Sequence, residues 1–237
     1  MNLILLSKDD FIDPGRRVRL TGRRHKHIRE ILKSSIGDEL CVGLLGDRIG
    51  KGRVLAIDDK AVEMEISLET DPPRPVPITL VLALPRPIVL KRVLSHVTAL
   101  GIKKIILIQT ERVEKSYWNS PALKEESIRT QLMLGLEQAK DTIMPEVLCR
   151  TKFKPFAEDE LPSLIRGTRA FLADPEAEEA APCGNATPAT LVIGTEGGFL
   201  PNEAALLKRA GCESVRFGKR ILRVETAVIA AIARLAP

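Results

Sequence analysis

The chain has 237 residues, 44% of them hydrophobic, which is enough to bury the cores of one small and one medium domain. Lysine and arginine number 36 against 31 aspartates and glutamates, so the formal net charge of +5 is by itself a weak argument for a polyanionic partner. The four cysteines lie far apart, without a CxxC pair or regular spacing to histidine, which argues against a zinc site and against a disulfide framework.

Signals for membrane insertion or secretion are not evident either. No apolar stretch reaches the roughly 18 residues needed to cross a bilayer, and the start MNLILLSKDDF lacks the basic region and cleavage site of a signal peptide. The sequence therefore predicts a soluble, cytoplasmic protein. Aromatic residues make up only 3% of the chain, so extensive stacking of bases is not expected, and a nucleic acid would be held mainly through charge and shape.

The first 70 residues alternate short β-like segments with turns. Strands are expected at residues 3–6, 16–20, 39–44, 52–57 and 61–68, as in a small barrel. One short helix is expected over residues 27–33, because Ile28, Ile31 and Leu32 recur at helical spacing. Residues 71–77 then hold four prolines, which the interior of a strand or helix does not tolerate, so we interpret them as a linker.

Basic residues are concentrated in one part of this first region. Eight lysines and arginines lie between Arg16 and Lys33, opposed in that window only by Glu30. Such a cluster suits phosphate groups, and an equally good interpretation from these residues alone is a solvated helix face.

After the linker the pattern changes to alternating strands and helices. An apolar run at residues 78–84, helical spacing that ends near residue 100 and a second run at 104–108 form a βαβ unit, which is typical of a parallel sheet covered on both faces. Further strands are expected at 170–173, 191–193 and 214–217, helices at 121–140, 201–210 and 225–235, and a surface loop at 177–187. The predicted fold class is α/β. A small β-barrel is expected over residues 1–70 and a domain with a parallel sheet over residues 78–237.

Two glycine-bearing turns follow the last predicted strands: IGTEGG at residues 193–198 and FGKRILR at residues 217–223. The first has no lysine followed by serine or threonine and is therefore not a Walker loop, and a Rossmann site would need its glycines after the first strand, where Pro85-Arg86-Pro87 stands. A backbone pocket with one acid, Glu196, fits an adenosine-type ligand better than a triphosphate. A purely structural turn is the alternative that short motifs leave open.

At these turns the sequence resembles a known family. IGTEGGF, followed by FGKRILRVETA, is similar to the paired signature of the RsmE family, bacterial enzymes that methylate N3 of a uridine in 16S ribosomal RNA. The resemblance extends over nearly the whole chain, through VGLLGDRIGKGRVLAIDD, LALPRP, ALGIKKI and GLEQAKDTIMPEV. It implies a PUA-like barrel, a SPOUT methyltransferase domain with a carboxyl-terminal trefoil knot, and a homodimer.

The resemblance also implies where S-adenosylmethionine would bind without a metal. Main-chain groups of the two turns would hold it: Ile193, Gly194, Glu196, Gly197 and Gly198 in the first, and Phe217, Gly218, Ile221 and Leu222 in the second. Glycines allow close approach of the backbone, and apolar neighbours exclude water from the sulfonium. The chain departs from the usual family pattern at Thr195 and Lys219, where proline is common, and at Val224, where threonine is common.

The reaction implied by the resemblance needs help with a proton, because N3 of uracil carries one. We expect Glu225 to accept this proton and Arg223 to stabilise the charge that spreads onto O2 and O4 of the ring. A glutamate that opens a helix also stabilises the helix dipole, and an arginine beside it can simply pair with it, so a structural role is the alternative for both residues.

The resemblance places the segment Arg23 to Arg29 where the RNA-facing part of the barrel begins. It therefore implies that Arg23, Arg24, Lys26 and Arg29 contact ribosomal RNA, either as naked 16S rRNA or in the assembled small subunit. Two other functions remain open: a SPOUT enzyme that methylates another RNA, such as a transfer RNA ribose, and an RNA-binding protein without catalytic activity.

Overall fold

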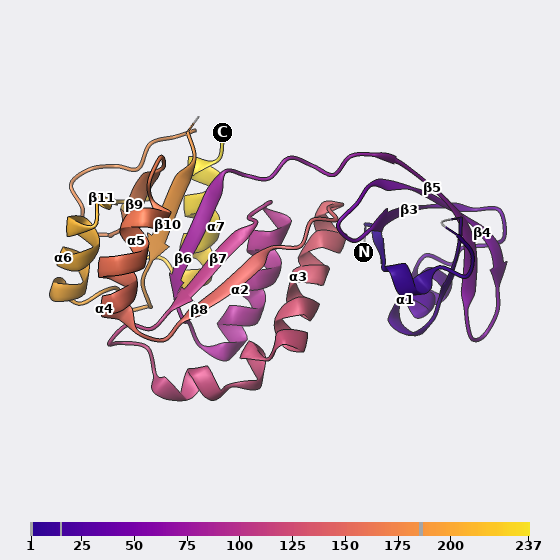
Figure 1. The fold of residues 1–237 in the computed structure, drawn as a ribbon, viewed down its shortest axis with the longest axis horizontal. Helices are drawn as coiled ribbons and strands as arrows, with labels where there is room; N and C mark the ends of the chain where they lie inside the picture. The colour runs from indigo at the N-terminus through magenta and orange to yellow at the C-terminus, as the bar shows by residue number, and fades with distance from the viewer. Residues whose placement is uncertain (1, 15, 185–186) are drawn as a thin grey trace. The chain divides into compact units, whose positions relative to one another are not determined.

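The computed structural model describes residues 2–14, 16–184 and 187–237. It divides the chain into two compact units, one formed by residues up to Arg74 together with Met133–Met144 and the other by Pro75–Leu132 and Pro145–Pro237 (Figure 1). Within the described part of the chain, no helix is long and apolar enough to cross a membrane.

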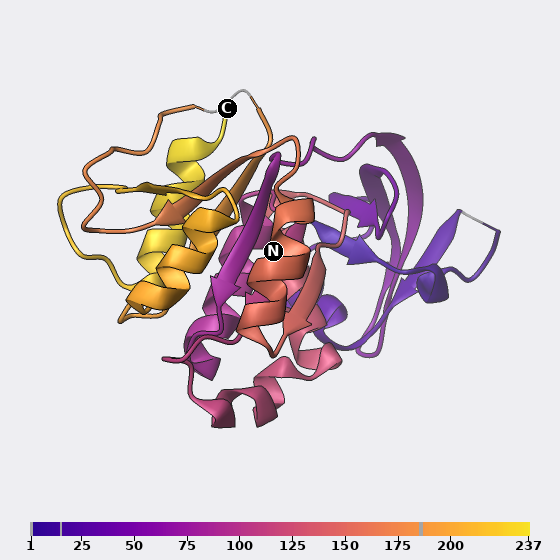
Figure 2. The same cartoon turned by 60° about the vertical axis from the view of Figure 1, so that its left-hand side comes forward.

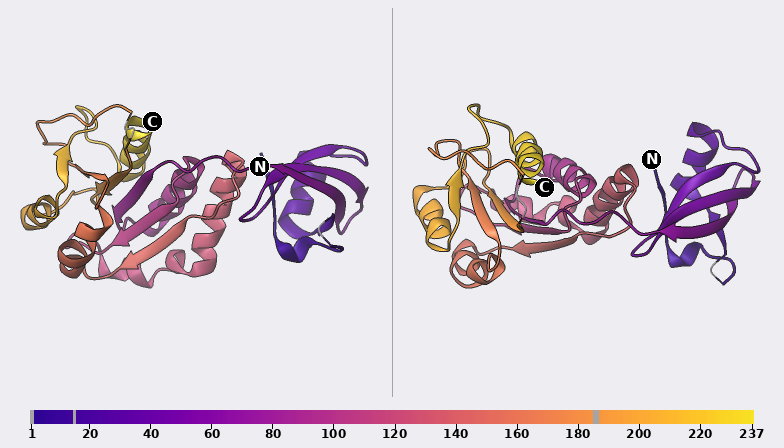
Figure 3. Two further views of the ribbon diagram at one scale, coloured as in Figure 1. Left: turned by 45° about the horizontal axis from the view of Figure 1, so that its top comes forward. Right: turned by 90° about the horizontal axis from the view of Figure 1, so that it is seen from above.

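The first unit contains a five-stranded, curled sheet with the strand order β1-β3-β4-β5-β2 (Figure 3). The strands are β1 (Ile4–Leu6), β2 (Arg17–Leu20), β3 (Glu39–Leu44), β4 (Ile49–Ile57) and β5 (Val62–Thr70). Strands β1 and β3 pair in parallel, whereas the other pairs are antiparallel. Alternate residues such as Val18, Leu20, Val54 and Met64 point into one apolar core, as the period-2 pattern predicts. This confirms the predicted barrel-like sheet.

Strand β4 begins three residues earlier than predicted, and glycine explains the difference. A Cβ atom at Gly50 would lie 1.8 Å from the carbonyl oxygen of Ser67, at a register shift between β4 and β5. Glycine is therefore required where the two backbones approach closely, and it does not end the strand.

The helix of this unit also differs from the expected one. It is formed by α1 (Gly22–Lys26) and a π-helical turn, η2 (His27–Ile31), rather than by residues 27–33. The side chains that face the core are His25 and Ile28, three residues apart, and the Nε2 atom of His25 lies 2.9 Å from the carbonyl oxygen of Asp58. Ile31, one of the three apolar residues whose spacing predicted the helix, is 68% exposed. The helical segment therefore begins five residues before the predicted start and ends two residues before the predicted end.

A segment far along the sequence completes this unit. Residues Met133–Met144 include the end of α3 (Glu125–Ala139), where Leu136 packs in a second small core with Leu3 and Leu5. The backbone N–H groups of Asn2 and Leu3 both donate to the carbonyl oxygen of Glu137, at 3.1 and 3.0 Å. The division into domains 1–70 and 78–237 stays a prediction, and this packing adds residues 133–144 to the compact unit that contains the barrel.

The second unit contains a six-stranded parallel sheet with the strand order β11-β9-β10-β6-β7-β8 (Figure 2). Its strands are β6 (Ile78–Ala83), β7 (Lys104–Ile108), β8 (Glu146–Arg150), β9 (Arg169–Ala173), β10 (Ala189–Ile193) and β11 (Glu213–Val215). Helices α2 (Pro87–Ala99) and α7 (Val224–Leu235) lie side by side on one face, and α5 (Leu161–Leu164) and α6 (Pro201–Arg209) cover the other (Figures 1 and 3). The predicted α/β class with a parallel sheet is confirmed.

The sequence pattern missed two parts of this unit. Strand β8 is a half-exposed edge strand with few apolar residues, so it lacks the continuous apolar run of a buried strand. The second part is an irregular helical segment formed by α4 (Phe153–Pro155), η5 (Phe156–Glu160) and α5, and its proline residues interrupt the helical pattern. The helix expected at 121–140 is divided, because the 3-10 turn η4 (Pro121–Leu123) precedes α3. The expected loop at 177–187 contains no helix or strand in its described part, residues 177–184 and 187.

Candidate active site

The first glycine turn lies directly after β10. The backbone N–H of Gly198 donates to the carbonyl oxygen of Thr195 at 2.8 Å, and the Thr195 hydroxyl donates back to the carbonyl of Gly198 at 3.3 Å. A Cβ atom at Gly194 would lie 3.0 Å from Cα of Gly198, and Gly198 itself has a φ of +70°. Close approach of the backbone favours glycine at position 194, and the left-handed backbone conformation favours it at position 198.

The second turn connects β11 to α7 and contains Phe217–Leu222. Arg223 is extended and forms the N-cap of α7, because its carbonyl oxygen accepts the N–H of Ala227 at 2.8 Å. Val224, the first residue of the helix, is buried, whereas Ile221 is 85% exposed. The turn therefore has one end fixed on the core and an exposed apolar middle.

The two turns meet at one cavity near the carboxyl ends of the strands. Eight of the nine residues that we expected around the cofactor line it: Ile193, Gly194, Glu196, Gly198, Phe217, Gly218, Ile221 and Leu222. The ninth, Gly197, is not part of the lining, and a Cβ atom there would lie 3.2 Å from Cδ and Nη1 of Arg112. The structure thus brings together two turns that are about twenty residues apart in the sequence.

A third strand end contributes residues that the sequence analysis missed. Ala173, Asp174 and Pro175, at the end of β9, line the same cavity, as does Ala227 in α7. The backbone N–H of Asp174 donates to the carbonyl of Val215 at 3.0 Å, which fixes this strand end beside β11. Ligands of open α/β sheets bind at the carboxyl ends of the strands, so the acid directly after the predicted strand 170–173 was a usable signal.

Polar and apolar groups are divided unevenly around the cavity. Two carboxylates, Asp174 and Glu196, and one guanidinium, Arg220, line it together with the Thr195 hydroxyl. The remaining side chains are apolar. The cavity has a volume of about 100 Å³, below the roughly 300–1,000 Å³ of cavities that hold a drug-sized ligand. A ligand of that size would therefore extend beyond this cavity.

Arg223 and Glu225 flank Val224, which lines the cavity, but they do not line it themselves. Arg223 is exposed and Glu225 is half-buried in the first turn of α7. Neither side chain has a hydrogen bond or ion pair with another residue of the described ranges. Both charged groups are therefore free to meet a molecule that approaches the start of α7.

The loop between β9 and β10 holds α7 in place. The N–H of Gly184 donates to the carbonyl of Arg234 at 2.9 Å, and Nε of Arg234 donates to the carbonyl of Ala181 at 2.7 Å. The same loop also pairs with the end of β11, where the N–H of Arg216 donates to the carbonyl of Glu179 at 2.8 Å. The loop therefore forms its hydrogen bonds with the last turn of α7. The trefoil knot implied by the resemblance stays a prediction.

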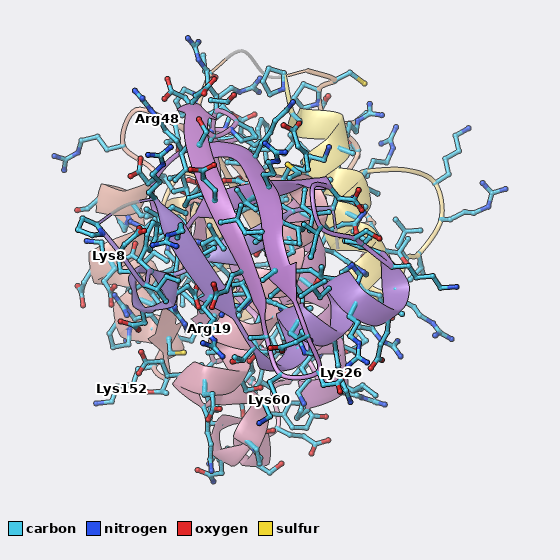
Figure 4. All side chains as sticks on the ribbon, turned by 90° about the vertical axis from the view of Figure 1, so that its right-hand side faces the viewer. Lys8, Arg19, Lys26, Arg48, Lys60 and Lys152 are labelled. Atoms are coloured by element: carbon cyan, nitrogen blue, oxygen red, sulfur yellow. The ribbon has the colours of Figure 1, made fainter. Side chains whose placement is uncertain are left out.

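The predicted RNA-contacting residues lie in the first unit and differ in their surroundings. Arg24 is only 21% exposed, and its Nη1 and Nη2 atoms donate to the two carboxylate oxygens of Asp10, both at 2.6 Å. Arg23 donates to Glu137, and Arg29 forms an exposed pair with Asp59 at 2.6 Å. Lys26 is exposed and has no partner among the described residues (Figure 4). The four residues are therefore not equally available to an external phosphate.

The pairing with Arg24 changes the pKa of the Asp10 carboxyl. Burial raises its pKa, but the hydrogen bonds from Arg24 and Ser7 outweigh burial and hold the pKa below its ordinary value of 3.8. The Asp10–Arg24 pair therefore remains charged at neutral pH and fastens η1 (Lys8–Asp10) to α1.

Comparison with known proteins defines the class to which this fold and site belong. The model of the RNA methyltransferase domain family matches residues 72–236, which include the parallel sheet and both turns. A ribosomal RNA small subunit methyltransferase E of Treponema pallidum is 32% identical over 98% of this chain and 90% of its own length. The corresponding enzyme 1 of Borreliella burgdorferi is 27% identical over 98% of this chain and 95% of its own length.

A solved structure agrees with the whole fold. A ribosomal RNA small subunit methyltransferase E from Neisseria gonorrhoeae, bound to S-adenosyl methionine, superimposes with a TM-score of 0.74, at 22% identity, over 98% of this chain and 95% of that chain. The protein is thus an RNA methyltransferase with a parallel α/β sheet and an amino-terminal barrel-like sheet. The chain belongs to the ribosomal RNA small subunit methyltransferase E family, the RsmE family that its motifs resemble.

Proposed function

We propose that this chain transfers a methyl group from S-adenosylmethionine to N3 of a uridine in 16S ribosomal RNA of the small subunit. The observation that carries the proposal is the cavity in which the two glycine turns meet. Val224 lines this cavity, and its neighbours in the sequence are Arg223 and Glu225. The RsmE relatives at 32% and 27% identity support the substrate class, since both are named for ribosomal RNA of the small subunit.

The chemistry of the cavity fits the cofactor. Ile193, Leu222 and Ala227 offer apolar surface to an adenine ring and keep water from a sulfonium. The carboxylates of Asp174 and Glu196 complement the cationic groups of S-adenosylmethionine, and Arg220 complements its carboxylate. The bound cofactor supplies an electrophilic methyl group.

Arg223 and Glu225 have the chemistry that the substrate requires. The proton on N3 of uracil must leave as the new N–C bond forms, and we assign its acceptance to the carboxylate of Glu225. The negative charge that spreads onto O2 and O4 is stabilised by the guanidinium of Arg223. Their lack of partners in the described ranges favours this assignment over a structural ion pair between them.

The assignment of the base is tested by Glu225→Gln. With bound cofactor and saturating RNA, we expect methyl transfer to slow by about 10²- to 10⁴-fold at neutral pH. The matched control is Thr226→Ser, an exposed neighbour in the same helical turn. An unchanged rate in Glu225→Gln, with cofactor affinity also unchanged, would exclude Glu225 as the base.

RNA contacts in the barrel are proposed for part of the basic cluster. Lys26 and Arg29 are exposed, and the surface pair of Arg29 with Asp59 costs little to break. Arg23 is half-exposed and is proposed to act with them. We assign Arg24 instead to holding Asp10, because its side chain is only 21% exposed, against 53% for Arg23, and donates to the Leu5 carbonyl as well as to Asp10.

We also propose that the chain works as a homodimer in the cytoplasm, as the family resemblance implies. Exposed apolar side chains support an interface: Ile88 in α2 is 63% exposed, and Ile221 projects beside the cavity. Light scattering at micromolar concentration should give about twice the 26.1 kDa mass of the chain. A monomer across that range would overturn the dimer.

The substrate is tested by presenting naked 16S rRNA, assembled small subunits and transfer RNA to the same enzyme preparation. Methyl incorporation, followed by mapping of the modified base, should give N3-methyluridine in 16S rRNA alone or in the subunit. Methylation of transfer RNA ribose would favour the other SPOUT activity. If calorimetry detected no binding of S-adenosylmethionine, the result would indicate a non-catalytic RNA-binding protein.

A further inference from the structure

A second and larger cavity opens in the parallel-sheet unit. It lies at the carboxyl ends of β7 and β8, beside the first turn of α6, and has a volume of about 700 Å³. That is within the range of roughly 300–1,000 Å³ for cavities that hold small ligands. None of the residues that line it also lines the cofactor cavity, although Leu200 follows the first glycine turn by only two residues.

Two ordered aromatic side chains line this second cavity. The indole Nε1 of Trp118 donates to Oε1 of Gln109, whose own Nε2 donates to the carbonyl oxygens of Thr110 and Val113 at 2.5 and 3.0 Å. Phe153 packs against Phe199 with ring centroids 6.3 Å apart. Both rings are thus held in place before any ligand binds. Unstacked nucleic-acid bases bind to aromatic surfaces of this kind.

One buried polar group among the described residues that line the cavity lacks a partner. Thr110 is 1% exposed, and its hydroxyl oxygen is buried without a hydrogen bond to any described residue. Buried hydroxyls in folded proteins are nearly always paired, so an orphan in the wall of a cavity points to a ligand. A hydroxyl both donates and accepts, and Asn202 at the start of α6 adds an amide with the same ability. Both match the edge of a nucleobase.

The charged groups of the cavity favour an anion at its mouth. Lys115 and Lys154 are exposed and have no partner among the described residues. The buried carboxylate of Glu203 is already used, because it accepts the N–H groups of Glu111 and Leu200, each at 2.8 Å. The carboxylate of Glu111 is the remaining charge, and it is exposed. Two flexible cations beside aromatic rings fit a nucleotide, with its phosphate outside and its base inside.

We propose that this cavity binds one unstacked nucleotide of the single-stranded RNA segment that contains the methylated uridine. The base contacts Trp118 and Phe153, its edge pairs with the Thr110 hydroxyl, and the adjoining phosphates contact Lys115 and Lys154. The reacting uridine is a different nucleotide, because Arg223 and Glu225, to which the reaction is assigned, do not line this cavity. This inference rests on the proposed function only in that the substrate is RNA.

Trp118 gives a direct measurement, because it is the only tryptophan of the chain. A ten-nucleotide oligouridylate titrated into the full-length protein should quench the Trp118 fluorescence and saturate. The midpoint should equal the one obtained from the anisotropy of the same oligonucleotide carrying a fluorescein label. A duplex of equal length, whose bases remain stacked, should leave the fluorescence unchanged. Oligonucleotide binding without quenching would overturn the inference.

Substitutions separate this cavity from a general electrostatic effect. Lys154→Gln should reduce the slope of log affinity against log salt by about 0.7, the value for one contact with a single strand. The matched control is Lys152→Gln, an exposed lysine two residues away that is not part of the lining (Figure 4), and its slope should not change. Equal slopes for the two variants would contradict the proposed phosphate contact.

The aromatic contact is tested with labelled oligonucleotide. Trp118→Leu should weaken binding about tenfold or more, and Trp118→Phe should restore most of it, since phenylalanine also offers a face for stacking. Calorimetry with S-adenosylmethionine should give the same affinity in all three proteins. A loss of cofactor affinity in Trp118→Leu would point to a structural role instead. Because no methyl transfer is measured, failure of the proposed reaction leaves these results interpretable.

Discussion

Arg23 and Glu137 form a two-point ion pair across 114 positions of sequence. The guanidinium Nη1 and Nη2 atoms of Arg23 donate to the carboxylate oxygens of Glu137 at 3.0 and 2.5 Å, and the Glu137 side chain is 2% exposed. The pair ties α1 to the end of α3, whose backbone also accepts the N–H groups of Asn2 and Leu3. A residue predicted for RNA binding therefore also closes the compact unit that contains the barrel.

Arg23→Ala should lower the free energy of unfolding by about 1–3 kcal/mol, because it leaves the buried carboxylate of Glu137 without its charged partner. Arg16→Ala is the control, since its pair with Glu65 is exposed and should contribute less than about 0.5 kcal/mol. Denaturant midpoints of the two variants measure the difference. Equal midpoints would contradict a structural role for Arg23.

The pair between Asp10 and Arg24 predicts a pH dependence of stability. Because hydrogen bonds hold the pKa of Asp10 below 3.8, the pair stabilises the folded state above the unfolded pKa of about 3.9. That contribution is lost as pH falls through the lower folded pKa. Asp10→Asn should therefore lower the thermal midpoint clearly at pH 7 and by progressively less as the pH falls below 3.8. A constant difference across that range would contradict the linkage.

The first glycine turn predicts a sharp contrast between neighbouring glycines. Gly194→Ala should abolish cofactor binding, because the new methyl group would meet the backbone of Gly198 at 3.0 Å. Gly197→Ala should bind the cofactor within a few-fold of the original chain, since its Cβ would meet only the flexible side chain of Arg112. Calorimetry with S-adenosylmethionine compares them, and equal affinities would show that the turn tolerates the change.

The basic cluster predicts different behaviour for Lys26 and Arg24. Lys26→Gln should reduce the salt slope of RNA binding by nearly one while leaving the unfolding midpoint unchanged, because Lys26 is exposed and unpaired in the described structure. Arg24→Gln should destabilise the fold, since it removes the partner of Asp10. Filter binding at several salt concentrations gives the slopes. If Arg24→Gln were as stable as the original chain and reduced the salt slope of RNA binding, Arg24 would instead contact RNA.

Thiol reactivity tests the packing of the parallel-sheet unit. Burial raises the pKa of Cys212 to about 12, so its thiolate is scarce at pH 8 and the side chain is also inaccessible. Cys183 is exposed in the loop that contacts α7. A thiol reagent followed by mass spectrometry should label Cys183 rapidly and Cys212 only after unfolding. Fast labelling of Cys212 in the folded protein would contradict the packing.

The sequence by itself determined the elements that local chemistry dictates. Apolar runs such as residues 104–108 match β7, the four prolines of 71–77 break regular structure, and the glycine turns lie after β10 and β11 as predicted. These features depend on propensity and periodicity over a few residues, which a single sequence contains. Eight of the nine residues that the family motifs assign to the cofactor line the cavity where the two turns meet, and their contact with the cofactor stays a prediction.

Only the tertiary structure decided which distant groups meet. Asp174 reaches the cavity between the two glycine turns because β9 pairs with both β10 and β11, and Trp118 reaches the second cavity through Gln109 at the end of β7. Arg24 is paired with Asp10, and Glu137 is buried and paired with Arg23, which lies 114 positions away in the sequence. Burial and pairing depend on sheet order and packing between remote segments, and no local pattern of residues encodes either.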